Sequence, residues 1–465
     1  MGFVNRRFFA IVVVALLLFV AGCGQSSLTS ARHSPSPSPS RSPSPSPVVQ
    51  SSDWLEYHGT AARSGQGPAL PVLSNPHQAW RAAVDAAVYA SPLIYHGRVI
   101  VATENNTVYS INLSDGSVFW NVHLATPVDA YSLPCGDITP ITGITGTPAI
   151  DPSNGRIYVV AFVSGLHHVL FTLDSIDGSI LDQKVIDPAG SSPAVQQERG
   201  ALALGSGYVY VPLGGLFGDC GPYHGYVVGV PLAGGGNLVY RTPTAREAGI
   251  WSSMGVTVSD AGTVYVTTGN GSETSSFAYS NTVLKLSPDL KVLDYFAPRN
   301  WAALDAGDTD LGSVGVTLLP DLSRLIAVGK EGVPYLLDAS HLGGIGGQLS
   351  ATRVCSGAWG GTAWLGSMVY LPCINALVAL NVSAGGYTIA WRAGQVRFAS
   401  PIVAAGAVWA IDVNTSNLFA LDPSTGADLF HVGLGTSQHF NTPAATEGYV
   451  VSPAGSAVVA VKTAA

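Results

Sequence analysis

The sequence of 465 residues carries little charge: Asp, Glu, Lys and Arg make up only 11% of it, and the formal net charge is −8. No basic patch is visible, which argues against nucleic acid as a partner. CxxC, CxxCH and HExxH motifs are absent, so the sequence predicts neither a zinc site nor covalently bound haem. Without a GxSxG elbow or a Walker A loop, nothing indicates a serine hydrolase or a P-loop nucleotidase either.

Glycine and proline, in contrast, are abundant, with 54 and 30 residues. Both favour turns, and with so little charge they are typical of an all-β protein that has few amphipathic helices. The length alone predicts about three domains, unless an internal repeat builds one large domain.

The first 23 residues, MGFVNRRFFAIVVVALLLFVAGC, predict an export signal. Arg6 and Arg7 precede an apolar run over residues 8–21, which is too short to span a bilayer comfortably. The run leads into Val-Ala-Gly-Cys, a pattern that resembles the bacterial lipobox, in which the cysteine is acylated. We therefore expect Cys23 to carry lipid and to hold an extracytoplasmic protein on a membrane. An ordinary signal in which Cys23 is incidental is the alternative, and both general secretion and twin-arginine export stay open.

Residues 24–52 contain SPSPSPSRSPSPSP, an alternation that cannot build a core and favours extended polyproline II. Fully extended, this segment would reach about 90 Å. The sequence thus predicts a lipoprotein signal over residues 1–23, a Ser/Pro-rich disordered linker over 24–52, and a folded domain over 53–465.

The folded part repeats one pattern. Residues 91–120 read SPLIYHGRVIVATENNTVYSINLSDGSVFW, in which short apolar runs are separated by turns at HG, EN and SDG. Four short antiparallel strands in each repeat, at a period of about 40–55 residues, predict the blades of a β-propeller. Several β-sandwich domains are the alternative. The other repeats, of which the last three are less regular, occupy residues 146–181, 360–391, 399–430, 199–242, 249–297 and 312–354.

The last repeat begins near residue 441 and has three strands instead of four. Residues 77–83, HQAWRAA, supply a matching strand, since Trp80 corresponds to the strand-ending Trp120 and Trp391. Pairing of the two termini would close the ring and remove two exposed sheet edges. We therefore predict an eight-bladed propeller of four-stranded antiparallel blades, and we expect residues 1–74 to add little to its stability.

These repeats resemble the quinoprotein alcohol dehydrogenase-like propellers, which consist of pyrroloquinoline quinone (PQQ) repeats, over nearly all of residues 75–462. That family includes PQQ-dependent alcohol dehydrogenases. It also includes the lipoprotein propeller of the outer-membrane β-barrel assembly machine, which has no cofactor and works by contacts. The resemblance thus implies the fold and leaves two classes of function open.

Four segments resemble parts of the quinone site of the dehydrogenases. In GIWSSMGVTVSDAGTVYVTTGN, the resemblance implies that Trp251 stacks on the quinone and that Asn270 binds Ca²⁺. In ALDAGDTDLGS it makes Asp308 the catalytic base and a calcium ligand. In GKEGVPYLLD it makes Lys330 the cation beside the quinone oxygens, and GDCGPYHGYVVGV offers Asp219 as a further calcium ligand. We expect the first four of these residues to line one central funnel, whether or not quinone binds.

Other positions depart from the pattern of the enzymes. Gly136 stands where the enzymes place the second of two adjacent cysteines, so that disulfide cannot form. Many of the enzymes have an arginine after this cysteine pair, but here no arginine lies between Arg98 and Arg156. The segment with Asp219 resembles one that carries a calcium-binding glutamate in the enzymes, yet it contains no glutamate. Each site residue also has a structural interpretation: Trp251 as a blade-packing side chain, the Asn and Asp residues as turn formers, and the lysine as a solvated charge.

Four cysteines follow Cys23, and outside the cytoplasm they could form two disulfides in three ways. The resemblance puts Cys135 and Cys220 near the central site, whereas Cys355 and Cys373 lie close together in the sequence of one blade. We expect the pairs Cys135–Cys220 and Cys355–Cys373.

The interpretation we favour is a lipid-anchored, extracytoplasmic binding or scaffold protein. It would be a monomer without a cofactor, would touch the membrane through its N-terminal lipid alone, and would present its loops to an envelope protein or a carbohydrate. The alternative is a PQQ- and Ca²⁺-dependent dehydrogenase that oxidises an alcohol or a sugar. Such an enzyme would need a separate electron acceptor, because the sequence has no haem motif.

Overall fold

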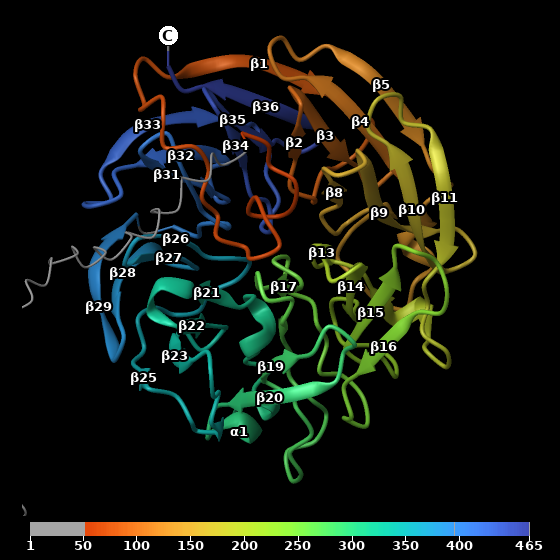
Figure 1. The fold of residues 1–465 in the computed structure, drawn as a ribbon, viewed down its shortest axis with the longest axis vertical. Coiled ribbons are helices and arrows are strands. Elements are labelled where there is room, and N and C mark those ends of the chain that lie inside the picture. Colours follow the sequence, from red (N-terminus) through yellow and green to blue (C-terminus); the bar gives the residue numbers. More distant parts are fainter. Residues whose placement is uncertain (1–51, 395, 465) are drawn as a thin grey trace, which may run out of the picture. The chain divides into compact units, whose positions relative to one another are not determined.

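Eight sheets, each based on four antiparallel strands, follow one another around a ring in the computed structural model, which describes residues 52–394 and 396–464 (Figure 1). The predicted all-β, eight-bladed propeller is therefore confirmed. Cys23 and the predicted signal and linker, apart from residue 52, lie outside the described residues. Within the described ranges, no helix is long and apolar enough to cross a membrane.

We number the blades in chain order from the first complete one and name their strands in the order in which they pair. Blades 1 and 2 consist of β2 (Leu93–Tyr95), β3 (Arg98–Ala102), β4 (Thr107–Asn112) and β5 (Val118–His123), then β8 (Ala149–Asp151), β9 (Arg156–Val163), β10 (His167–Asp174) and β11 (Ile180–Val185). Blades 3 and 4 consist of β13 (Ala203–Gly205), β14 (Tyr208–Gly215), β15 (Tyr226–Pro231) and β16 (Leu238–Arg241), then β17 (Thr257–Val258), β18 (Val264–Thr267), β19 (Val283–Leu286) and β20 (Val292–Ala297).

The second half of the ring continues the same pattern. Blades 5 and 6 consist of β21 (Thr317–Leu319), β22 (Arg324–Ala327), β23 (Tyr335–Asp338) and β25 (Ser350–Ala351), then β26 (Ala363–Leu365), β27 (Met368–Cys373), β28 (Ala376–Ser383) and β29 (Gly386–Ala393). Blades 7 and 8 consist of β30 (Ile402–Ala404), β31 (Ala407–Asp412), β32 (Asn417–Leu421) and β33 (Asp428–Gly433), then β34 (Ala444–Thr446), β35 (Tyr449–Pro453), β36 (Ala457–Lys462) and β1 (His77–Ala83).

A few short elements supplement the blades. β12 joins blade 3, β24 joins blade 4 in parallel, and β6 and β7 form a separate hairpin between blades 1 and 2. These strands and the helices span β6 (Val128–Asp129), β7 (Ile141–Thr142), β12 (Gln196–Gln197), β24 (Gly344–Ile345), η1 (Ala130–Ser132), η2 (Pro193–Val195), α1 (Trp301–Ala306), η3 (Leu311–Ser313) and η4 (Pro320–Leu322).

The first strand of each blade lies next to the axis of the ring. First strands of neighbouring blades contact one another, as in the pairs β2 with β34, β13 with β17, and β26 with β30. Fourth strands such as β5 and β11 are largely exposed and lie at the rim. Loops that lead into the first strands therefore converge near the axis, where they can form a common site.

The ring closes where the sequence predicts. β1 pairs antiparallel with β36, and Trp80 lies opposite Ala460. The indole of Trp80 is 7% exposed, and its Nε1 donates a hydrogen bond to the carbonyl oxygen of Leu113 over 2.7 Å. Its ring covers Gly116 in a turn of blade 1, where an added Cβ would lie only 2.9 Å from the indole. Glycine is required there because φ is +77° and because the ring approaches the backbone so closely.

The same contact links other blades. Trp120 covers Gly178, and Trp391 covers Gly426, each at a distance that leaves no room for a Cβ. Each indole also donates a hydrogen bond to a carbonyl oxygen in the turn that it covers. The strand-ending tryptophans of the repeat are therefore contacts between blades.

The segment before β1 belongs to the core. Trp54, Tyr57, His58 and Arg63 are at most 1% exposed. The backbone of residues 54–67 forms hydrogen bonds with the first strands of blades 1, 2, 4, 6 and 7. Figure 1 shows this orange start of the described chain running inward toward the middle of the ring. The expectation that residues 1–74 add little to stability is therefore wrong for this segment, because it fills the space between the first strands.

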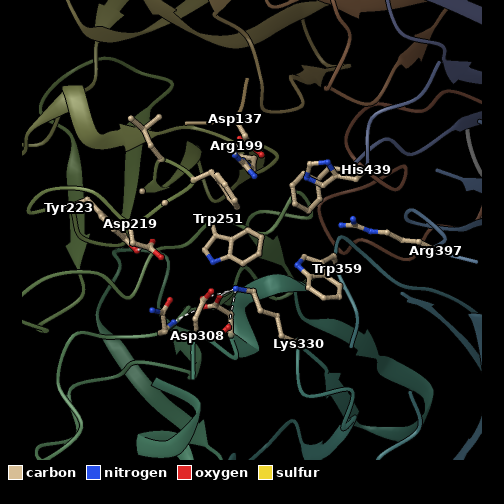
Figure 2. A pocket seen from close by; sticks show the side chains of 17 residues that line it. Asp137, Arg199, Asp219, Tyr223, Trp251, Asp308, Lys330, Trp359, Arg397 and His439 are labelled. Carbon is tan, nitrogen blue, oxygen red and sulfur yellow. Dashed lines mark hydrogen bonds and ion pairs between the residues drawn. The ribbon is translucent and has the colours of Figure 1, made fainter. Parts of the chain in front are cut away.

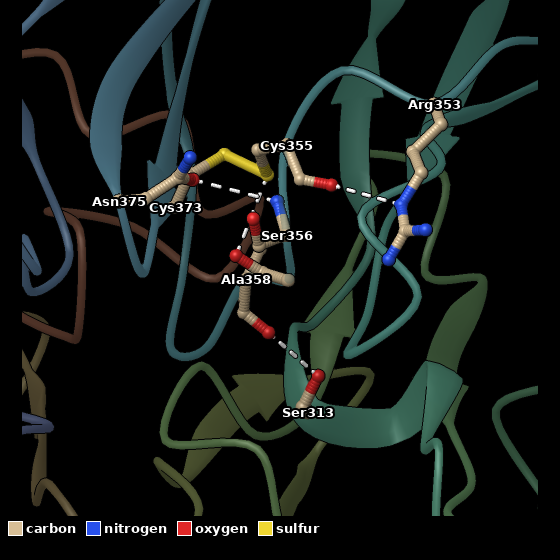
Figure 3. Close-up of a disulfide and its surroundings, with 8 residues drawn as sticks. Ser313, Arg353, Cys355, Ser356, Ala358, Cys373 and Asn375 are labelled. Atoms are coloured by element: carbon tan, nitrogen blue, oxygen red, sulfur yellow. Dashed lines mark hydrogen bonds between the residues drawn. A yellow bond between two sulfur atoms is a disulfide. The ribbon is translucent and has the colours of Figure 1, made fainter.

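Two disulfides hold loops in place, one against a blade strand and one against another loop. Cys355 joins Cys373 at the end of β27, so the loop that enters blade 6 is tied to that blade (Figure 3). The same loop is held from blade 5, where the Ser313 hydroxyl donates to the carbonyl oxygen of Ala358 over 2.8 Å. Cys135 joins Cys220 across 85 residues, between the loop around β6 and β7 and the loop that follows β14.

Candidate functional site

A cavity of about 450 Å³ opens where the loops of the blades converge. Figure 2 shows the indole of Trp251 in its middle, surrounded by charged and aromatic side chains. The cavity is lined by Asp137, Arg199, Gly215, Leu216, Phe217, Gly218, Asp219, Tyr223, Trp251, Asn270, Asp308, Asp310, Lys330, Trp359, Arg397, His439 and Phe440.

The structure brings the five site residues of the sequence analysis to this one cavity. Trp251 lies in the loop before β17, and Asn270 follows β18. Asp308 lies between α1 and η3, Lys330 follows β22, and Asp219 lies in the loop after β14. They come from blades 3, 4 and 5, whose loops meet because these blades are neighbours in the ring.

Lys330 links two carboxylates beside the Trp251 ring. Its Nζ lies 2.7 Å from Oδ1 of Asp308 and 2.5 Å from Oδ2 of Asp310, and it lies 5.6 Å from the centre of the indole. Asp308 is an exposed partner, and Asp310 is a buried one whose other oxygen accepts the backbone N–H of Asn270. The lysine therefore binds both acids and stands within reach of the aromatic face.

Burial and pairing shift the pKa values in this cluster. Burial raises the pKa of Asp310 from its ordinary 3.8 to about 6, against the opposing effect of Lys330. Burial lowers the pKa of Lys330, but the charges and hydrogen bonds of Asp310 and Asp308 outweigh this effect and raise it above its ordinary 10.5. Lys330 is therefore a permanent cation at neutral pH.

The opposite wall depends on the disulfide between Cys135 and Cys220. Gly218 lines the cavity and lies against Cys135, since a Cβ on this glycine would be 3.5 Å from the cysteine Cβ. Asp219, next to Cys220, accepts a hydrogen bond from the Tyr223 hydroxyl over 2.5 Å. Although Gly136 rules out a bond between adjacent cysteines, a disulfide thus still supports the wall of this cavity.

The third side of the cavity was not predicted from the sequence; it consists of Arg199, Trp359, Arg397, His439 and Phe440. These residues belong to blades 3, 6, 7 and 8 and match no segment of the quinone site. One signal could have found them. Each lies four or five residues before the first strand of its blade, and Trp251 lies six residues before β17. Position relative to that strand, rather than motif, predicts which side chains reach the axis.

The arrangement of donors does not fit a calcium ion. Ca²⁺ binds six to eight oxygen atoms. The carboxylates of Asp308 and Asp310 are both bound to Lys330, and that of Asp219 accepts from Tyr223. Among the described residues, no three His, Cys, Asp or Glu side chains converge as metal ligands.

The fit to a planar quinone is partial. Trp251 offers an aromatic face, and the edge of Phe440 approaches it with the ring centres 6.1 Å apart. Lys330, Arg199 and Arg397 line the same cavity and could pair with the acid groups of such a molecule. With its carboxylates arranged in this way, the cavity has no place for the Ca²⁺ ion that would polarise the quinone carbonyl.

Comparison with known proteins supports the same fold. Residues 67–268 match the family model described as "Outer membrane protein assembly factor BamB". Among solved structures, the chain is 14% identical to the quinohemoprotein alcohol dehydrogenase ADHIIG of Pseudomonas putida HK5, with a TM-score of 0.72 over 89% of this chain and 80% of that one. A europium-containing methanol dehydrogenase gives 15% identity and a TM-score of 0.68, over 87% of this chain and 90% of that one.

BamB of Moraxella catarrhalis is 14% identical, with a TM-score of 0.57 over 83% of this chain and 99% of that one. No curated protein matches the sequence. The resemblance to PQQ-repeat propellers is therefore confirmed. At these identities it establishes a fold that dehydrogenases and an assembly factor share.

Proposed function

We propose, from the premise that this chain is a PQQ-like-repeat eight-bladed propeller, that it is a binding protein held outside the cytoplasm by a lipid on Cys23. Its ligand would occupy the central cavity, and a protein or carbohydrate of the cell envelope is the class of partner that we expect. The fold is common to enzymes and to BamB, so the choice between the two rests on the cavity.

The observation that carries the proposal is the pairing of Lys330 with Asp308 and Asp310. A dehydrogenase of this fold would use such carboxylates to take a proton and to hold Ca²⁺. Here an ammonium group binds both of them, and Asp219 is hydrogen-bonded to Tyr223. The cavity also has aromatic faces and cations, which can bind a ligand without catalysing a reaction.

The location rests on the N-terminal sequence. A short apolar run, a Val-Ala-Gly-Cys end and a Ser/Pro-rich linker together describe a lipid anchor with a spacer. Disulfides between Cys135 and Cys220 and between Cys355 and Cys373 agree with an oxidising compartment.

Replacing Cys23 with serine should release the protein from membranes. Serine cannot form the thioether that carries the lipid, and each buried CH₂ contributes about 0.8 kcal/mol to membrane binding. The measurement is fractionation of cells that express the wild type or the variant, with detection of the full-length protein. As a control, Cys23 stays in place and Cys355 and Cys373 are replaced by serine, which should leave membrane association unchanged. If Cys23→Ser stays in the membrane fraction, the anchor is not this lipid.

A PQQ-dependent dehydrogenase is the second candidate, because Trp251, Asn270, Asp308 and Lys330 line one cavity. We expect no turnover when the purified protein is reconstituted with PQQ and Ca²⁺ and assayed with alcohols, sugars and an artificial electron acceptor. Robust reduction of the acceptor that Asp308→Asn abolishes would overturn the binding function in favour of the enzyme. Asp289→Asn, on an exposed turn paired with Lys291, is the matched control.

A further inference from the structure

Arg397 differs from the other two cations of the cavity, Lys330 and Arg199, because, in the part of the chain that the structure describes, those two are paired with carboxylates and it is not. It lies in the loop between β29 and β30, is partly buried, and stands over the Trp359 ring with its guanidinium carbon 5.3 Å from the ring centre. Burial lowers the pKa of Arg397. Among the described residues, its guanidinium has no carboxylate partner and donates no hydrogen bond.

The neighbours of Arg397 do not compensate its charge. Burial, reinforced by the nearby Arg199 and Arg397, lowers the pKa of His439 from its ordinary 6.5 to about 4, so this imidazole is neutral at pH 7. Asp137, which also lines the cavity, already pairs with Arg199 over 3.2 Å. This wall therefore carries one positive charge for which the protein supplies no counter-charge.

The opposite wall carries carboxylates instead of an unpaired positive charge. Figure 2 shows Asp219 and Tyr223 across the cavity from Arg397, with the Trp251 indole between them. Asp308 is exposed, with its side chain 64% accessible, and Asp219 is partly exposed. Besides the bonds from Tyr223 and Lys330, their oxygen atoms have further lone pairs that can accept hydroxyl groups of a ligand. The two aromatic faces of Trp251 and Trp359 lie between the positive wall and the acceptors.

We propose that the ligand of this cavity is an acidic sugar, a uronate, whose carboxylate pairs with Arg397. This inference rests on the proposed binding function. One uncompensated guanidinium matches a singly charged carboxylate, which can accept two parallel N–H bonds from its fork. The sugar ring presents apolar C–H groups that pack on an indole face. The hydroxyl groups at its other end donate to Asp219 and Asp308.

Two other kinds of ligand match the groups of this cavity less well than a uronate does. An aromatic acid such as 4-hydroxybenzoate would satisfy Arg397 and the indoles, but its single hydroxyl group would add fewer donors to Asp219 and Asp308 than a sugar does, beyond those that Tyr223 and Lys330 already supply. A neutral sugar would satisfy those acceptors and leave the guanidinium desolvated and unpaired. Each of these mismatches costs binding free energy, because polar groups that the ligand covers lose water without gaining a partner.

The experiment is a titration of the purified protein with D-glucuronate, D-galacturonate and D-mannuronate, followed by tryptophan fluorescence and calorimetry. D-Glucose, D-galactose and D-mannose are the neutral probes of the same shape, and 4-hydroxybenzoate is the aromatic acid. We expect at least one uronate to bind at least about tenfold more tightly than its neutral parent, because a charge-assisted hydrogen-bond pair is lost in the parent. We also expect 4-hydroxybenzoate to bind more weakly than that uronate.

Arg397→Gln should remove most of this preference, while Arg392→Gln should keep it, because Arg392 is exposed on β29 and does not line the cavity. Thermal melts of both variants verify that they fold. The inference is overturned if no uronate binds, if the neutral parents bind as tightly, if 4-hydroxybenzoate binds best, or if a folded Arg397→Gln protein keeps the preference. Binding of a neutral sugar or an aromatic acid would leave the proposed binding function standing. Turnover with PQQ, measured separately, would refute that function whatever ligand binds.

Discussion

Replacing Arg63 with methionine is expected to lower the free energy of unfolding by about 3–5 kcal/mol, since it leaves one member of a buried ion pair alone. The side chain is fully buried, and its Nη1 lies 3.0 Å from Oε2 of Glu56. The same guanidinium donates to the carbonyl oxygens of Val256, Leu202 and Tyr57 over 3.0, 2.5 and 3.0 Å. It thus connects the N-terminal segment to blades 3 and 4.

The loss of stability in Arg63→Met has two causes: the Glu56 carboxylate loses its cation, and backbone carbonyl oxygens lose a hydrogen-bond donor. Burial raises the pKa of Glu56, and Arg63 opposes that shift through its charge and its hydrogen bond. Without the arginine, the carboxylate must stay charged with only the backbone N–H of Leu204 as a partner, or take up a proton, and the carbonyl oxygens that Arg63 bound lose its side chain as a donor. Methionine fills much of the volume, so the effect reports lost polar contacts rather than a cavity.

Urea unfolding followed by tryptophan fluorescence measures the effect. The double variant Glu56→Gln/Arg63→Met should recover part of the loss, because a neutral amide replaces the unpaired carboxylate. Arg156→Met is the control for an arginine that is exposed at the start of β9, and we expect it to change stability by less than about 0.5 kcal/mol. A loss below about 1 kcal/mol in Arg63→Met would contradict a structural role for this ion pair.

Replacing Trp80 with alanine should lower the free energy of unfolding by about 3–5 kcal/mol, the usual loss when a large buried aromatic side chain is removed. The indole covers Gly116 in the first blade, while its strand pairs with the last strand of the chain. Removal of the ring opens a cavity between blades 8 and 1 and ends the hydrogen bond to Leu113. It therefore weakens the closure of the ring, on which all other blades depend.

Two further variants separate closure from the loss of an aromatic ring. Phe119→Ala removes a ring that is 50% exposed at the rim of blade 1, and we expect a loss of less than about 1 kcal/mol. Gly116→Val keeps the tryptophan but places side-chain atoms where its ring now lies, so it should destabilise as well. Equal midpoints for Trp80→Ala and Phe119→Ala in urea would show that the closing contact adds nothing beyond a surface aromatic side chain.

Much of the architecture could be predicted from the sequence because the features that specify a blade are local. Turns such as HG and SDG between apolar runs mark the strands, and the repeat period marks the blades. Even the closure could be predicted, since one repeat lacks a strand and residues 77–83 carry the matching Trp80. The N-terminal segment was missed because Trp54 and Arg63 follow no periodic pattern, and their burial depends on first strands from several blades that lie far away in the sequence.

The sequence by itself determined the propeller fold, its closing strand and one side of the central cavity, where Trp251, Asn270, Asp308 and Lys330 occur within one continuous stretch of chain. Only the tertiary structure decided what that cavity contains. It joined Lys330 to both Asp308 and Asp310, and it brought Arg397 into the same space from a loop of blade 7. The physical reason is that local patterns encode hydrogen-bonded strands, whereas pairing between charges from separate loops depends on how a closed ring places those loops around its axis.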